Sequence, residues 1–302
     1  MRTWLGGQLA ARAEIDLNAF LLLAMNEDNT ISVIDPQIAL SRTKLRELIA
    51  LASRPADWAL QPSGSRLWVT LPATDGLAVI DGGELRVLST LATGKRPTQV
   101  VVAPDGHTVW VGNDGEGSVT IVDAEARRPV ETIATGAGPQ RIAFVERGRT
   151  AAVAARDAGT IALIDVATRA RRGVIDAGVG VDAIAASDAA GVLVAVRGRA
   201  GEVVIVDVDR AAVTQRIRLA PGIGTVAFDP TGRWAFVLDP AGGRVTILDP
   251  SGAIPDRTIG GFAGPDAIAF TARYAYVRNR AAARLSLVQL EDVEEGIAPG
   301  VL

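Results

Sequence analysis

Hydrophobic and polar residues alternate in short runs, and turn residues divide the chain into strand-sized segments. The clearest example spans residues 97–138, where four runs rich in β-branched side chains follow one another. Gly, Pro, Asp or Asn bounds each run, as at Pro104-Asp105-Gly106, where Pro fixes φ and Gly accepts positive φ. Such runs between such turns are typical of antiparallel strands. The pattern therefore predicts a unit of four short antiparallel strands.

The same unit recurs along the chain with a period of 42 residues. The residues that open successive units are Pro55, Pro97, Pro139, Val181, Ile223 and Pro265. The acids that end the third run of each unit are Asp35, Asp81, Asp123, Asp165, Asp207 and Asp249. A four-stranded unit of this length is typical of one blade of a β-propeller. The second strands follow the same spacing and indicate seven units in all.

We therefore predict an all-β protein, a single seven-bladed β-propeller over residues 1–302, built from four-stranded antiparallel blades. The expected blades are residues 9–54, 55–96, 97–138, 139–180, 181–222, 223–264 and 265–290. The last blade supplies only three strands from its own segment. Residues 1–6 align with the end of a fourth strand, so we expect the N-terminal strand to complete the seventh blade and close the ring. Residues 291–302 then form an acidic tail.

Residues 41–51 allow two interpretations. Leu45, Leu48 and Ile49 would share one face of a short helix capped by Ser41. The propeller pattern instead places an outer strand over residues 45–51. The sequence favours neither.

The amino-acid composition limits the kinds of site that the protein can contain. The chain has 302 residues, a net charge of −3, no cysteine and one histidine. Disulfides, thiolate metal sites and a cysteine nucleophile are excluded, as is any mechanism that needs two histidines. The sequence has no block of basic residues, so it does not predict binding to duplex nucleic acid. No apolar run reaches the length of a membrane span, and the first residues lack the apolar core of a signal peptide.

Most of the conspicuous residues have structural interpretations. The aspartates that end the third strands are expected to accept hydrogen bonds from turn N–H groups. The single histidine, His107, is expected in a solvent-exposed turn. Four tryptophans are expected to fill the core between blades: Trp58, Trp68, Trp110 and Trp234.

The loops of one propeller face vary from blade to blade and are the candidate binding surface. These are the connections between blades and the loops between second and third strands, and binding sites commonly use such loops on a rigid scaffold. The residues selected from this face are Asp57, Arg96, Asn113, Asp114, Arg141, Arg156, Asp182, Arg197, Asp239, Asp266, Arg278 and Asn279. Its arginines predict either a cationic sector that suits an acidic protein patch or a small anionic ligand, or ordinary surface charge.

The second and third strands carry a family resemblance. Trp110-Val111-Gly112-Asn113, Tyr276-Val277-Arg278-Asn279 and Ile31-Ser32-Val33-Ile34-Asp35 resemble the repeats of the YVTN family of seven-bladed propellers. That superfamily includes surface-layer and cytochrome d1-like propellers, so the resemblance implies an exported, periplasmic or extracellular bacterial or archaeal protein. The haem d1 relatives bind iron through histidines, and this chain does not supply them.

Two functions remain open at this stage. We expect a monomeric, non-catalytic binding or scaffolding propeller that engages a protein partner or small anionic ligand through its loop face, with no cofactor, metal or catalytic residue. The alternative is a lactonase- or lyase-type propeller enzyme that holds a divalent metal on carboxylates in its channel. The missing histidine cluster favours the first, and the identity of the ligand stays open.

Overall fold

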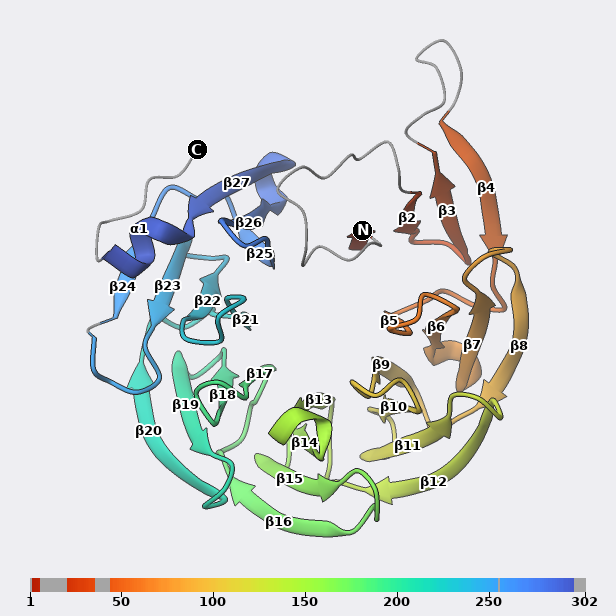
Figure 1. Ribbon diagram of the computed structural model, residues 1–302, viewed down its shortest axis with the longest axis horizontal. Coiled ribbons are helices and arrows are strands. Elements are labelled where there is room, and N and C mark those ends of the chain that lie inside the picture. The colour runs from red at the N-terminus through yellow and green to blue at the C-terminus, as the bar shows by residue number, and fades with distance from the viewer. Residues whose placement is uncertain (1, 6–20, 36–43, 255, 296–302) are drawn as a thin grey trace. The chain divides into compact units, whose positions relative to one another are not determined.

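The protein is an all-β seven-bladed propeller with almost no helix, as predicted (Figure 1). The computed structural model describes residues 2–5, 21–35, 44–254 and 256–295. Six sheets have four antiparallel strands and the last has three. The chain divides into two compact units, residues 1–140 and 141–302, which are described in turn.

The first unit holds three sheets that follow one another in chain order (Figure 1). The first sheet comprises β1 (Arg2–Leu5), β2 (Leu22–Met25), β3 (Thr30–Ile34) and β4 (Leu45–Ala50). The second comprises β5 (Trp58–Leu60), β6 (Arg66–Leu71), β7 (Gly76–Asp81) and β8 (Val87–Ala92). The third comprises β9 (Pro97–Val102), β10 (Thr108–Asn113), β11 (Ser118–Asp123) and β12 (Arg128–Ala134).

The second unit holds the remaining four sheets. The fourth sheet comprises β13 (Gln140–Val145), β14 (Thr150–Ala155), β15 (Thr160–Asp165) and β16 (Arg171–Asp176). The fifth comprises β17 (Ala183–Ser187), β18 (Val192–Arg197), β19 (Glu202–Asp207) and β20 (Ala212–Arg218). The sixth comprises β21 (Thr225–Phe228), β22 (Ala235–Asp239), β23 (Arg244–Leu248) and β24 (Arg257–Ile259). The seventh comprises β25 (Pro265–Phe270), β26 (Tyr274–Asn279) and β27 (Arg284–Gln289), and helix α1 (Leu290–Glu295) follows it.

The core lies between successive sheets of each unit. Second and third strands are buried along nearly their whole length because both of their faces are covered, and they therefore read as continuous apolar runs. Fourth strands are mostly exposed and polar. Trp68, Trp110 and Trp234 are among the largest fully buried side chains, which confirms their expected place in the core, and Trp58 is half-buried.

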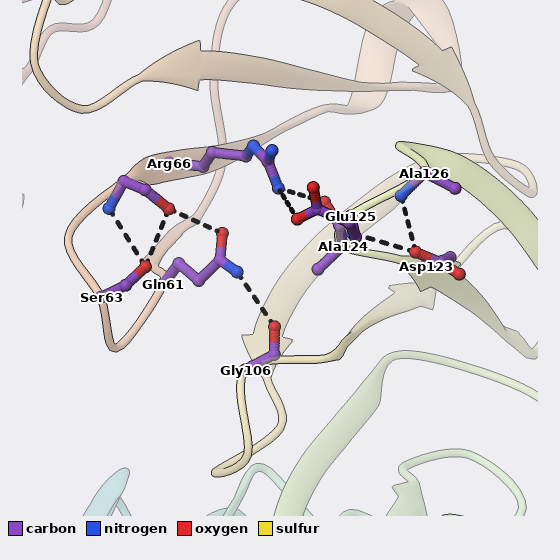
Figure 2. A network of polar contacts seen from close by, with 9 residues as sticks. Gln61, Ser63, Arg66, Gly106, Asp123, Ala124, Glu125 and Ala126 are labelled. Atoms are coloured by element: carbon purple, nitrogen blue, oxygen red, sulfur yellow. Dashed lines mark hydrogen bonds and ion pairs between the residues drawn. The ribbon is translucent and has the colours of Figure 1, made fainter.

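Hydrogen bonds between turns join the second sheet to the third (Figure 2). Gln61 donates through Nε2 to the carbonyl of Gly106 at 3.0 Å. Arg66 donates to the carbonyl of Ala124 at 2.6 Å and approaches the carboxylate of Glu125. Asp123 accepts backbone N–H groups from the two residues of the turn that follows it, as expected for an aspartate at that place. The same capping occurs at Asp81, Asp165, Asp207 and Asp249.

The N-terminal strand differs from the prediction. Strand β1 pairs with β2, in the register Arg2↔Met25 to Leu5↔Leu22, and so belongs to the first sheet and not to the seventh. The side of β2 away from β3 would otherwise leave backbone groups without partners among the described residues, and pairing with β1 satisfies them. The acidic segment expected as a tail instead begins as helix α1, whose Val293 is fully buried against the sixth and seventh sheets.

The ambiguity over residues 41–51 is resolved for its described part. Residues 45–50 form the outer strand β4, which pairs with β3. Ile49 is buried in the core between the first and second sheets, whereas Leu45 and Leu48 are exposed. Residues 41–43 lie outside the described part of the chain.

Candidate functional site

The aspartates selected from the first unit accept hydrogen bonds from backbone N–H groups. The carboxylate of Asp57 is buried and accepts the N–H of Val100 in the next sheet at 3.1 Å. The carboxylate of Asp114 accepts the N–H of Gln140 at 2.9 Å. Each of these buried or half-buried carboxylates accepts a hydrogen bond from a backbone N–H group. Their positions therefore contribute to the stability of the fold.

Arg96 differs from the other selected residues because it is exposed. Its backbone has φ of 49° and its N–H donates to Asp75 Oδ1 at 2.8 Å. That bond, together with the ammonium of Lys95 at 2.7 Å from Oδ2, holds the pKa of Asp75 below its ordinary value. The loop backbone is thus fixed while the Arg96 guanidinium extends into solvent.

Asn113 and Asn279 occupy equivalent positions at the ends of β10 and β26 and are both fully buried. Each donates through Nδ2 to a hydroxyl group on the neighbouring third strand, Ser118 and Ser286 respectively, at 2.9 Å. These bonds fix the position of both side chains. Both asparagines therefore belong to the framework of the loops.

The acids selected from the sixth and seventh sheets are paired with arginines. Asp239 is buried and forms an ion pair with Arg244 at 2.8 Å. Asp266 accepts both Nε and Nη2 of Arg278 at 2.8 Å, a bidentate geometry that fixes both groups. The pair with Asp266 raises the pKa of Arg278. Of the twelve selected residues, four from the fourth and fifth sheets are brought together in one cluster, described next.

Asp182 is the centre of that cluster. Its Oδ1 lies 2.7 Å from Nε of Arg156, which follows β14. Its Oδ2 accepts the N–H of Gly198, which follows β18, at 2.9 Å. Its backbone carbonyl accepts Nε of Arg141 on β13 at 2.8 Å. One aspartate therefore ties two sheets and two loops together.

Arg197 extends the cluster along the connection between the two sheets. Its Nε donates to the carbonyl of Val179 at 3.0 Å, and its Nη1 pairs with Glu202. Arg216 on β20 also pairs with Glu202, at 3.0 Å, and donates to the carbonyl of Ala177 at 3.1 Å. Burial opposes ionisation of Glu202, but the hydrogen bonds from the two arginines outweigh it and hold the pKa of this carboxyl below its ordinary value.

Sequence reasoning did not select Glu202 and Arg216. Glu202 opens a third strand and Arg216 lies on a fourth strand, so their places in the repeat gave no sign of a role on the loop face. The sequence did offer one signal, which was opposite charge on neighbouring strands. Glu202 on β19 directly opposes Arg218 on β20, and Arg216 lies two residues before Arg218 on the same strand.

The cluster carries a surplus of positive charge. Four guanidinium groups, of Arg141, Arg156, Arg197 and Arg216, gather around the two carboxylates of Asp182 and Glu202, so positive groups exceed negative groups by two. The exposed neighbours Asp157, Asp176 and Arg199 reduce this surplus to one. We call the four arginines, the two carboxylates, Val179 and Arg199 the arginine cluster.

Val179 gives the arginine cluster an apolar projection. It is 63% exposed, and it lies between Gly178 and Gly180, which both have positive φ. A Cβ on Gly178 would lie 2.8 Å from the guanidinium carbon of Arg197, so a side chain there would displace the guanidinium group. The loop is held in place by Arg197 and by the N–H of Gly180, which donates to the carbonyl of Arg156 at 2.7 Å.

The described part of the chain contains no group of three or more His, Asp or Glu side chains placed to hold a metal ion. His107 is exposed, and its N–H donates to Asp105 within a turn, as predicted. Partial desolvation and the charge of Asp249 raise the pKa of Asp256, which lies between β23 and β24. No helix among the described residues is long and apolar enough to cross a membrane.

Comparison with solved structures finds a similar fold in hydrazine synthase of Kuenenia stuttgartiensis. The TM-score is 0.69 at 20% sequence identity, over 80% of this chain and 78% of that chain. Likeness at this level of identity shows the fold alone. No family model matches the chain, and no curated protein sequence matches it. The resemblance to YVTN repeats therefore stays a prediction from the motifs quoted above.

Proposed function

We propose that this chain is a non-catalytic binding or scaffolding propeller, which engages an acidic surface of a protein partner through the arginine cluster. The observation that carries the proposal is the surplus of guanidinium groups around the exposed Val179. Arginine and exposed apolar side chains together are typical of protein interfaces.

The arrangement suits binding because it is already ordered. Arg156 and Arg197 are held by Asp182, Glu202 and the Val179 carbonyl before any partner arrives, so binding costs little side-chain entropy. Arg199 is exposed beside them and supplies a charge for the first encounter. We expect the other selected residues to hold the neighbouring loops in place.

Poly-L-glutamate labelled with fluorescein provides a probe for an acidic surface. We expect the full chain to bind it at low salt and the affinity to fall as salt rises, because the interaction is between exposed charges. Arg199→Glu should weaken binding roughly fivefold or more, since charge reversal adds repulsion. Arg46→Glu is the matched control: Arg46 is also exposed and the change in net charge is the same, but it lies on the outer strand β4, outside the arginine cluster.

Equal weakening by the two variants, or no binding at low salt, would contradict the proposal. Citrate tests the small-ligand version of the same chemistry. If citrate alone raises the thermal midpoint in a saturable way and Arg199→Glu removes the effect while poly-L-glutamate does not bind, the site takes a small anion and the proposed protein partner is wrong.

A further inference from the structure

Strand β27 has an edge that the other sheets cover with a fourth strand. In each of the other six sheets the third strand pairs on both sides, with the second strand and with an outer fourth strand. Within the described part of the chain, β27 pairs with β26 only. After Gln289 the chain turns into α1, where Arg257 of β24 donates to the carbonyl of Val293. The helix therefore packs beside the sixth sheet, and no described strand pairs with the outer edge of β27 (Figure 1).

The open edge presents backbone groups ready for pairing. The N–H of Leu290 donates back to the carbonyl of Arg273, on the β26 side, at 2.9 Å. Backbone groups of successive residues in a strand point to alternate sides. The N–H and C=O groups of Leu285, Leu287 and Gln289 therefore point to the open side. In the second sheet the residue equivalent to Gln289, Asp81, uses its N–H to bond Arg86 ahead of the fourth strand.

The exposed side chain of Leu285 indicates that the β27 edge lacks an aliphatic partner. The equivalent residues of the other six sheets are each 0% exposed, and each lies directly opposite an Ile or Leu of the fourth strand. These pairs are Ile31↔Ile49, Leu77↔Leu91, Val119↔Ile133, Ile161↔Ile175, Val203↔Ile217 and Val245↔Ile259. Leu285 is 59% exposed. Its side chain occupies a position that is built for an aliphatic partner across the ladder.

Charges at the two ends of the edge define the partner further. Arg284 is exposed at the start of β27, and Glu291 is exposed beyond its end. The residue of the fifth sheet that is equivalent to Arg284 is Glu202. It lies directly opposite Arg218, which carries the opposite charge. An antiparallel strand that fits this edge would therefore be basic at its start and would end with an aliphatic residue followed by an acid. Strand β16, which begins with Arg171 and Arg172 and ends with Ile175 and Asp176, has this pattern.

We propose that the β27 edge is a docking site for an extended segment of another protein, which adds as the fourth strand of the seventh sheet. The segment places Ile or Leu opposite Leu285 and Asp or Glu opposite Arg284. A second copy fits less well, because β27 itself has no acid to face Arg284. Backbone pairing supplies affinity and the aliphatic and acidic positions supply specificity, as in other cases of strand addition. An uncovered edge with an exposed leucine is otherwise a liability for aggregation.

A peptide with the sequence of residues 169–178 serves as the probe, because it carries the pattern of β16. We expect saturable binding of the fluorescein-labelled peptide to the full chain, measured by anisotropy. A peptide with Ile175→Asp should bind roughly tenfold more weakly, since it loses the aliphatic partner. Leu285→Lys in the protein should have a similar effect. Leu48→Lys is the matched control, because Leu48 is similarly exposed on the outer strand β4 and should not change binding.

Hydrogen exchange gives a second measurement that does not depend on a variant. The amides of Leu285 and Leu287 should exchange rapidly in the free protein and become protected when the peptide binds. Protection in the free monomer would mean that the chain covers its own edge, and protection that depends on protein concentration would mean that a second copy covers it. Either result, or peptide binding that Leu285→Lys leaves unchanged, would overturn the proposal.

Discussion

Asp182 Oδ1 lies 2.7 Å from Nε of Arg156, and this contact joins the loops of the fourth and fifth sheets. The other carboxylate oxygen of Asp182 is also occupied, by the N–H of Gly198. These two contacts fix the carboxylate of Asp182 in place. Asp182 therefore positions the arginines of the cluster, and the arginines provide the charge that a partner would meet.

Removing this carboxylate should destabilise the protein by a modest amount. Asp182→Ala loses a partly exposed ion pair and one hydrogen bond to a backbone N–H, so we expect the free energy of unfolding to fall by about 1–2 kcal/mol. Urea unfolding monitored by tryptophan fluorescence measures the change. Asp157→Ala is the control, because Asp157 is exposed and forms neither of these bonds, and it should change stability by less than about 0.5 kcal/mol. A larger loss in the control would remove the assigned role of Asp182.

The repeat explains why the fold could be predicted from the sequence and why the N-terminal pairing could not. Each blade carries the same strand and turn signals, so errors at one blade do not propagate to the others. Residues 1–6 resemble the end of a fourth strand, but four residues with strand propensity can pair with any uncovered edge. The edge of β2 and the edge of β27 were both available, and the structure uses that of β2.

The candidate face was visible in the sequence only as a set of loops. The repeat predicts which loops share a face, but pairing within it depends on side-chain geometry. Arg156 and Arg278 read alike in the sequence, yet the first joins a cluster with Asp182 while the second forms a separate bidentate pair with Asp266. Glu202 was missed because it opens a third strand and was not assigned to the preceding loop. Sequence periodicity carries no information on such contacts.

One recurrent turn position offers a gain in stability. Arg127 has φ of 50° in the turn before β12, and the equivalent residues Leu85, Arg169 and Ala211 also have positive φ. Glycine adopts this conformation without steric cost. Arg127→Gly should therefore raise the free energy of unfolding by about 0.5–1 kcal/mol, after allowing for the greater freedom of glycine in the unfolded chain.

Arg128 provides the comparison for that variant. It is also exposed, but it belongs to β12 and pairs with Asp123 across the ladder. Glycine in a strand loses conformational entropy, so Arg128→Gly should lower stability by about 0.5–1 kcal/mol. Parallel urea titrations of the two variants measure both changes. The explanation from positive φ fails if Arg127→Gly destabilises the protein as much as Arg128→Gly does.

The turn aspartates make part of the stability dependent on pH. Hydrogen bonds from the N–H groups of Glu84 and Gly83 hold the pKa of Asp81 below its ordinary value of 3.8. A carboxyl whose pKa is lower in the folded state stabilises the fold above its unfolded pKa, and this contribution is lost as the pH falls through the folded pKa. The deficit of Asp81→Asn relative to the natural protein should therefore be full at pH 7 and 5 and should shrink below about pH 3.8.

Asp81→Ala separates charge from hydrogen bonding in the same experiment. Asparagine keeps an oxygen that can accept the two N–H groups, whereas alanine does not. The deficit of Asp81→Ala should therefore persist in acid, where that of Asp81→Asn diminishes. Urea titrations at several pH values measure both. Deficits that run parallel across the whole range would show that the charge of Asp81 does not contribute.

The two buried asparagines should differ in their importance although they occupy equivalent positions. Asn279 donates through Nδ2 to Ser286, and its Oδ1 accepts the N–H of Ala263 at 2.8 Å. Asn113 donates to Ser118 and Thr120, but no described residue donates a hydrogen bond to its buried Oδ1. An unsatisfied buried acceptor offsets part of the gain from the other bonds. Asn279→Ala should therefore lower the free energy of unfolding by about 2–3 kcal/mol, and Asn113→Ala by about 1 kcal/mol less. Chemical unfolding of both variants measures the difference, and equal losses would show that the Asn113 amide is satisfied in solution.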